Sequence, residues 1–194
     1  MRVLAASAIA LLAALQAGCG QSATEQAKPA NPVQSPAAVS PATTAPSVTA
    51  PQGKFDAISN TAMGVTGDLS ATGGGFAFSQ GQTYGLEGVG TAKGADPYAV
   101  TKASFSSLIN VPDAAVLDVF RITKEDHAQA RNGGFCGAEP TTFIVTHEGV
   151  DSGGGPALFL IAFSGASPPS GNSPENELCG TFMYAPSAGP PATK

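Results

Sequence analysis

Residues 157–164 read ALFLIAFS and form the strongest β-strand pattern in the chain. The run is apolar and follows three glycines and a proline, and a short apolar run bounded in this way is typical of a buried strand. Residues 141–146 (TTFIVT) have the same character, with β-branched and aromatic side chains. The glycine-rich segment between these two runs indicates a turn, so the runs are predicted to be neighbouring strands of an antiparallel sheet.

Alternating residues extend the β pattern toward the N-terminus. Residues 116–123 read VLDVFRIT and residues 64–72 read GVTGDLSAT. Alternate residues of a strand point to the same face, so each segment is expected to be a strand with one face toward the core. In the first segment that face is expected to carry Val116, Asp118, Phe120 and Ile122. In the second it is expected to carry Val65, Gly67, Leu69 and Ala71.

A hairpin and a final strand complete the β pattern. Residues 76–79 and 82–92 are separated by Gln80-Gly81, and a short glycine-containing turn between two such runs predicts a hairpin. Residues 180–184 (GTFMY) are expected to form the last strand.

One segment departs from the strand pattern. In residues 104–110 (SFSSLIN), Ser104 fits a helix N-cap and Pro112 fits a stop, so a single helical turn is expected there. Phe105 and Leu108 would then face the core. The fold class predicted for residues 53–186 is mostly β, an antiparallel β-sandwich or small β-barrel with one short helical turn.

The chain begins with the features of a secretory signal peptide. Met1 and Arg2 provide a basic start, and residues 3–15 (VLAASAIALLAAL) are apolar. A bilayer-spanning helix needs about 20 apolar residues, so this run is too short to cross. Residues 1–18 are therefore expected to be a cleaved signal peptide.

The end of this signal resembles the lipobox of bacterial lipoproteins. Residues 15–19 read LQAGC, and three of them match the family pattern: Ala17, Gly18 and Cys19. Gln16 departs from it, because the family usually has Leu there. The resemblance implies that the Cys19 thiol is lipidated and that Cys19 becomes the first residue after cleavage. Ordinary signal cleavage is the alternative. In the resembled family, Asp after the Cys retains the protein in the inner membrane, so Gly20 implies an outer-membrane anchor facing the periplasm, with the inner membrane and the cell surface as alternatives.

A linker is expected between the anchor and the domain. Residues 19–52 are rich in Ala, Pro, Ser and Thr and contain few large apolar side chains. Such a composition cannot bury enough apolar surface to offset the entropy cost of ordering, so this segment is predicted to be a disordered spacer. The tail, residues 187–194, is expected to be disordered as well.

Two cysteines lie within the predicted domain. After export, Cys136 and Cys179 would meet an oxidising compartment, where paired cysteines form disulfides. We therefore expect a Cys136–Cys179 disulfide, and a reactive thiol is the alternative. Cys19 would remain free for lipid.

Catalytic and metal-binding motifs are not evident in the sequence. His127 and His147 lie in no HExxH or His-x-His pattern, and no GxSxG elbow is present. His127 is expected on a solvated connection and His147 at a strand end. The glycine runs 73–75 and 153–155 are expected to be hairpin turns rather than phosphate-binding loops. No catalytic, metal or cofactor-binding residue is predicted, and the loops 132–137 and 167–174 are the first candidates for binding a partner.

The charge balance narrows the range of partners. The chain has 9 Lys and Arg against 14 Asp and Glu, a formal net charge of −5. Nucleic-acid binding depends on basic patches, so nucleic acid is excluded as a partner. The leading expectation is a membrane-anchored envelope lipoprotein with a non-enzymatic β domain that binds an envelope protein or the cell wall. One alternative is similar in layout to the membrane-bound lysozyme inhibitors, which are small disulfide-bonded β-barrels on a lipid anchor. The other is a cell-envelope hydrolase.

Overall fold

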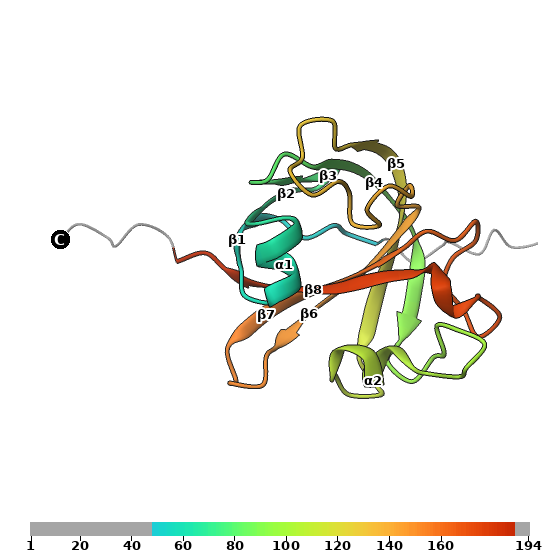
Figure 1. The fold of residues 1–194 in the computed structure, drawn as a ribbon. Coiled ribbons are helices and arrows are strands. Elements are labelled where there is room, and N and C mark those ends of the chain that lie inside the picture. The colour runs from blue at the N-terminus through green and yellow to red at the C-terminus, as the bar shows by residue number, and fades with distance from the viewer. Residues whose placement is uncertain (1–47, 189–194) are drawn as a thin grey trace, which may run out of the picture. The chain divides into compact units, whose positions relative to one another are not determined.

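A closed, eight-stranded antiparallel β-barrel forms the folded part of the protein (Figure 1). The computed structural model describes residues 48–188. The strands are β1 (Gly53–Ala57), β2 (Leu69–Thr72), β3 (Gly75–Phe78), β4 (Thr83–Lys93), β5 (Val116–Asp126), β6 (Phe143–Val150), β7 (Pro156–Phe163) and β8 (Leu178–Pro186). The helical elements are α1 (Asn60–Val65), α2 (Phe105–Ile109) and one 3₁₀ turn (Glu175–Glu177). The predicted mostly-β fold is confirmed, in its small-barrel form.

The strand order makes the two ends of the barrel different. Each strand pairs with its neighbour in sequence, and β1 closes the sheet against β8. We call one end the mouth: it carries the β2–β3, β4–β5 and β6–β7 connections and both ends of the described chain. We call the other end the base: it carries the remaining four connections, including α1.

Aromatic side chains fill the barrel interior. The buried core includes Phe76, Phe78, Tyr84, Phe182 and Tyr184. Phe135, from the β5–β6 loop, joins them, with its ring centroid 5.1 Å from that of Phe78. An eight-stranded barrel is just wide enough for side chains to fill it, so this interior is a packed core rather than a ligand cavity.

A second apolar layer covers the outer face of β5–β7. The outward side chains of these strands pack against the β4–β5 connection, which contributes Tyr98, Phe105 and Ile109. Figure 1 shows α2 and this connection beside the ends of β4 and β5. As a result β7 is covered on both faces, and every residue from Ala157 to Phe163 is buried. This double burial is the reason that ALFLIAF shows no alternation.

The expected helical turn and hairpins are confirmed. The Ser104 side chain accepts a hydrogen bond from the Ser107 N–H at the start of α2, and Asn110 ends the helix in the left-handed conformation (φ 54°). Phe105 is buried, and Leu108 is partly buried against the same core. β3 and β4 form the predicted hairpin, and both glycine runs lie at hairpin turns, β2–β3 and β6–β7.

The prediction of one strand over residues 64–72 is wrong in its first half. α1 occupies residues 60–65, and only Leu69–Thr72 is a strand. The Ser59 hydroxyl accepts from the Ala62 N–H, which caps the helix, and Gly67 adopts φ +67° and reverses the chain. Val65 and Leu69 are four residues apart, a spacing that fits a helix face as well as strand alternation. β1 and its pairing with β8 were not predicted either.

A disulfide fixes the β5–β6 loop at the base. Cys136 is bonded to Cys179 at the start of β8, with their Cα atoms 4.9 Å apart. The prediction of this pair is confirmed. Because Phe135 is the neighbouring residue and is only 4% exposed, the disulfide holds the loop where its aromatic side chain closes the core.

Candidate functional site

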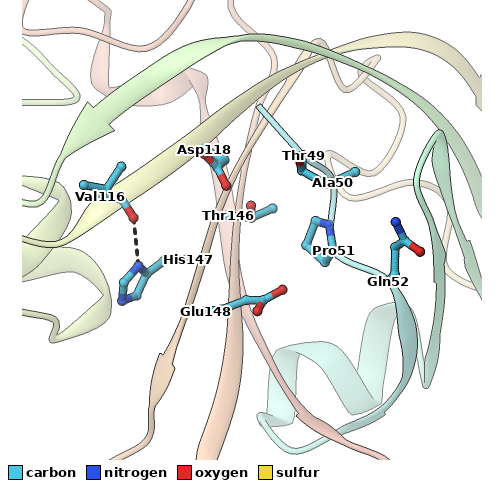
Figure 2. Close-up of a pocket in the computed structure, with 9 residues that line it drawn as sticks. All are labelled: Thr49, Ala50, Pro51, Gln52, Val116, Asp118, Thr146, His147 and Glu148. Carbon is cyan, nitrogen blue, oxygen red and sulfur yellow. Dashed lines mark hydrogen bonds between the residues drawn. The ribbon is translucent and has the colours of Figure 1, made fainter. Parts of the chain in front are cut away.

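A pocket of about 630 Å³ opens at the mouth of the barrel. Figure 2 shows it between β5 and β6 on one side and the segment before β1 on the other. Its lining consists of Thr49, Ala50, Pro51, Gln52, Val116, Asp118, Thr146, His147 and Glu148.

The register of β5 and β6 brings three polar side chains to this pocket. Asp118 lies directly opposite Thr146, and Glu148 follows two residues later on the same face of β6. This is the face that carries Phe120 and Ile122 deeper in the barrel, as the alternation in VLDVFRIT predicts. Figure 2 shows the Thr146 side chain between those of Asp118 and Glu148. The inward face of these strands therefore changes from apolar to polar at the mouth.

The Asp118 carboxylate lacks an internal partner. It is half-buried and accepts no hydrogen bond from the other described residues. Thr146 beside it is 2% exposed. Burial raises the pKa of Asp118 above its ordinary value, and the nearby positive charge of His147 opposes this shift. The Asp118 carboxylate therefore faces the pocket without a hydrogen-bond donor from the described residues.

His147 lies beside the pocket, and its position differs from the prediction. It is inside β6, not at a strand end. Its Nδ1 lies 2.9 Å from the Val116 carbonyl oxygen, and because a carbonyl only accepts, Nδ1 carries the hydrogen. The ring stacks on Phe159 with centroids 6.2 Å apart. This arrangement fixes the imidazole on the outer rim of the pocket.

The segment 48–52, which we call the strap, forms the opposite wall. Ala50 is 5% exposed and Pro51 is also buried. A Cβ atom on Gly88 would lie 2.8 Å from the Cβ of Val48, so the missing side chain at Gly88 makes room for the strap. The composition placed these residues in the linker, but the folded part begins at least five residues before Gly53.

A second polar cluster lies at the base, where most groups are hydrogen-bonded to one another, while Gln82 Oε1 and His127 Nδ1 are buried without a hydrogen-bond partner among the described residues. Glu125 accepts hydrogen bonds of 2.8 Å from both the N–H and the hydroxyl of Thr141. The Tyr84 hydroxyl accepts from the Phe135 N–H at 2.9 Å, and burial raises the pKa of Tyr84. His127 Nδ1 lies 3.6 Å from Glu125 Oε1. These contacts hold the disulfide-linked loop on the barrel, and we assign the cluster a structural role.

The two histidines lie at opposite ends of the barrel. His127 follows β5 at the base, half-exposed beside the largely buried Glu125, and His147 lies at the mouth. Within residues 48–188, no serine hydroxyl is hydrogen-bonded to either imidazole. That range also contains no group of three His, Cys, Asp or Glu side chains arranged to hold a metal ion. The histidines therefore belong to two separate environments rather than to one catalytic cluster.

The two loops expected to bind a partner are both attached to the fold. In the loop 132–137, Gly133 accepts a hydrogen bond from the buried Gln82 amide, and Phe135 is buried. In the loop 167–174, the Lys102 ammonium donates to the Gly171 carbonyl at 3.0 Å. The sequence did not indicate the pocket at the mouth, because that pocket depends on strand register and on a strap whose composition resembles that of a linker.

Comparisons with known proteins do not extend this description. No protein-family model matches the chain. No curated protein matches its sequence. No solved structure matches it either. Across the described residues, no helix is long and apolar enough to cross a membrane. Cys19, the expected lipid anchor, lies outside the described residues.

Asp118→Asn is expected to stabilise the protein slightly at neutral pH. An acid whose pKa is raised by folding destabilises the folded state when ionised, and this penalty disappears as the pH falls through its pKa. The variant should unfold about 1 °C higher than wild type at pH 7, because the group is only half-buried. At pH 3, below the ordinary value of 3.8, the difference should vanish. Thermal unfolding at both pH values tests this, and a loss of stability at pH 7 would show that Asp118 has a stabilising partner.

Proposed function

We propose that this protein is a membrane-anchored envelope lipoprotein, and that its barrel is a non-enzymatic binding domain that uses the mouth. The observation that carries the proposal is the open pocket at the mouth, which lies between the strap and the polar side chains of β5 and β6. The Asp118 carboxylate faces this pocket and accepts no hydrogen bond from the other described residues. A pocket with a small number of polar groups is typical of a binding site.

The packed interior supports binding at the mouth rather than inside the barrel. Phe78, at the centre of the core, is in aromatic contact with Phe76, Tyr84, Phe135 and Tyr184. A ligand inside the barrel would have to displace these rings. A partner at the mouth needs only to cover Asp118, Thr146 and Glu148.

A basic partner protein is favoured by the two carboxylates of the mouth. This observation also supports the alternative of a lysozyme inhibitor, because lysozymes are basic. The membrane-bound lysozyme inhibitors have a similar layout, a disulfide-bonded barrel on a lipid anchor. The hydrolase alternative draws no support from the histidines, since His147 Nδ1 is committed to the Val116 carbonyl. The carboxylate nearest His127, Glu125, is occupied by Thr141.

The anchor is tested by metabolic labelling. Cells that express the full chain and grow with a labelled fatty acid are expected to incorporate the label into the wild-type protein. Cys19→Ser should abolish incorporation, because the lipidated thiol is removed. Cys136→Ser is the matched control and should retain the label. A labelled Cys19→Ser variant, or an unlabelled wild type, would contradict the proposed anchor.

Binding at the mouth is tested separately by site-specific photo-crosslinking in cells. A crosslinking amino acid would replace Glu148, which is exposed at the mouth, or Ala128, which is exposed at the base. Specific adducts are expected only from position 148. Identical adducts from both positions, or none from position 148, would overturn the assignment of the mouth as the binding end.

A further inference from the structure

We propose that β6 binds an extended segment of a partner protein as an added β-strand at the mouth. The segment would carry cationic side chains toward the barrel interior and apolar side chains toward the outer face of the sheet. This inference rests on the proposed binding role of the mouth and names the form and chemistry of the partner. It is carried by residues 147–150, which we call the free edge because they have a neighbouring strand on one side only.

The free edge exists because β5 and β6 separate at the mouth. The pairing of β5 with β6 ends at Asp118 and Thr146, whereas the pairing of β6 with β7 continues to Val150 and Pro156. Beyond Thr146 the contact with β5 is made by a side chain, since His147 Nδ1 lies 2.9 Å from the Val116 carbonyl oxygen (Figure 2). Residues 147–150 therefore have a strand neighbour only in β7.

The alternation of hydrogen bonds shows where the backbone groups of the free edge point. The Ile122 N–H donates to the Thr142 carbonyl, so the even-numbered residues of β6 direct their N–H and C=O groups toward β5. By the same alternation, Glu148 and Val150 direct theirs toward the space that β5 has left. Val150 is 64% exposed and forms no backbone hydrogen bond to the β4–β5 connection. A strand edge exposed in this way is a template for pairing with another strand.

The outer face beside the free edge is apolar. A pocket of about 560 Å³ is lined there by the free edge, by residues 109–112 and by Phe159 and Met183. Gly149 has no side chain to fill this face, and a Cβ at its position would lie 2.8 Å from His147 Nε2 and 3.8 Å from the Phe159 ring. An apolar side chain of an added strand would occupy this pocket.

The inner face beside the free edge is acidic. Asp118 and Glu148 both lie on it, and within residues 48–188 neither carboxylate forms an ion pair. Opposite charges on neighbouring strands stabilise their pairing, so cationic side chains are expected on the inner face of the added strand. A second copy of this chain would present its own Glu148 and Asp151 at the edge, and charge therefore favours a basic segment of another protein.

The test is fluorescence anisotropy of the full-length protein with a dye-labelled hexapeptide of alternating lysine and valine. A Kd of about 1 mM or tighter is expected. A hexapeptide of alternating glutamate and valine should bind at least fivefold more weakly, because its charges would face Asp118 and Glu148. Equal binding of the two hexapeptides, or no binding of the first, would overturn the proposal.

Backbone methylation distinguishes strand addition from diffuse attraction. Main-chain hydrogen bonds give strand addition its affinity, and only alternate N–H groups of the peptide would face β6. Methylation of the lysine nitrogens or of the valine nitrogens of the backbone leaves the charge of the peptide unchanged. One methylated peptide should bind at least tenfold more weakly and the other within about twofold of the parent. The lysine set is the sensitive one in an antiparallel complex and the valine set in a parallel one. Equal affinities of the two methylated peptides would overturn strand addition.

A variant locates the added strand at β6. Val150→Pro removes an N–H from the free edge and is expected to weaken binding at least fivefold. Proline is tolerated on an edge strand where the N–H faces solvent. Val150→Ala is the matched control, because it keeps the N–H, and it should bind like the wild type. Wild-type affinity in a folded Val150→Pro variant would overturn the assignment to this edge. If that variant does not fold, the methylated peptides decide the question on the wild-type protein.

The outcome separates this inference from the proposed function. If position 148 forms specific crosslinks but the methylated peptides bind equally, strand addition fails and the mouth remains the binding end. If position 148 forms no adducts and the hexapeptide does not bind, the binding role of the mouth fails as well. Specific crosslinks together with one sensitive methylation set support both.

Discussion

Replacing both Cys136 and Cys179 with serine is expected to lower the free energy of unfolding by about 4 kcal/mol. The bond joins residues 43 apart in sequence, so its loss frees a long loop in the unfolded chain. The folded state should lose order at the base too, because Cys136 and Cys179 both pack against the barrel core.

Urea unfolding of the wild type and of the double variant would measure this difference. The shift in melting temperature is expected to be about 10 °C. Wild-type protein treated with a reductant should match the double variant, and this comparison controls for the serine hydroxyls. Reduced and oxidised wild type with the same unfolding midpoint would contradict the stabilising role of the bond.

Phe135→Ala is expected to lower the free energy of unfolding by about 3–5 kcal/mol, which is the usual loss when a core aromatic side chain is truncated. Although Phe135 belongs to a loop, it is 4% exposed. Its ring centroid lies 4.7 Å from those of Tyr84 and Phe182. Truncation would leave a cavity among three rings that the rigid barrel cannot close.

Two further variants make this prediction specific. Phe135→Leu should recover much of the loss because it refills most of the volume. Val150→Ala, at a position that is 64% exposed, should change stability by less than about 0.5 kcal/mol. Phe135→Ala should lower the free energy of unfolding by less in a protein without the disulfide than in one with it, since the bond and the Phe135 side chain both hold the same loop. Strict additivity would indicate that the disulfide does not position Phe135.

The sequence was sufficient to predict those features whose signals lie in the residues that form them. The apolar run at residues 157–164 predicted β7 because both of its faces are buried. Ser104 marked the start of α2 through its own hydrogen bond to the backbone. The two cysteines of the domain indicated their pairing because the predicted export left them in an oxidising compartment.

Features that depend on distant parts of the chain could not be predicted. Closure of β1 against β8 joins residues more than a hundred positions apart, and this pairing is what distinguishes a barrel from a sandwich. The opposition of Asp118 and Thr146 follows from the β5–β6 register, which depends on packing on both sides of the sheet. The strap resembles a spacer in composition, and only the space beside Gly88 shows why it lies on the barrel.

The strap also determines where mechanical force would enter the domain. The chain before Val48 continues directly into it, so tension along that chain is applied at the pocket wall. Residues 49–52 are held by side-chain packing without backbone hydrogen bonds to the strands, whereas β1 is held by ladders on both sides. Under load the strap would detach before β1. Because residues 49–52 line the pocket, their detachment would remove one of its walls while the barrel stayed closed.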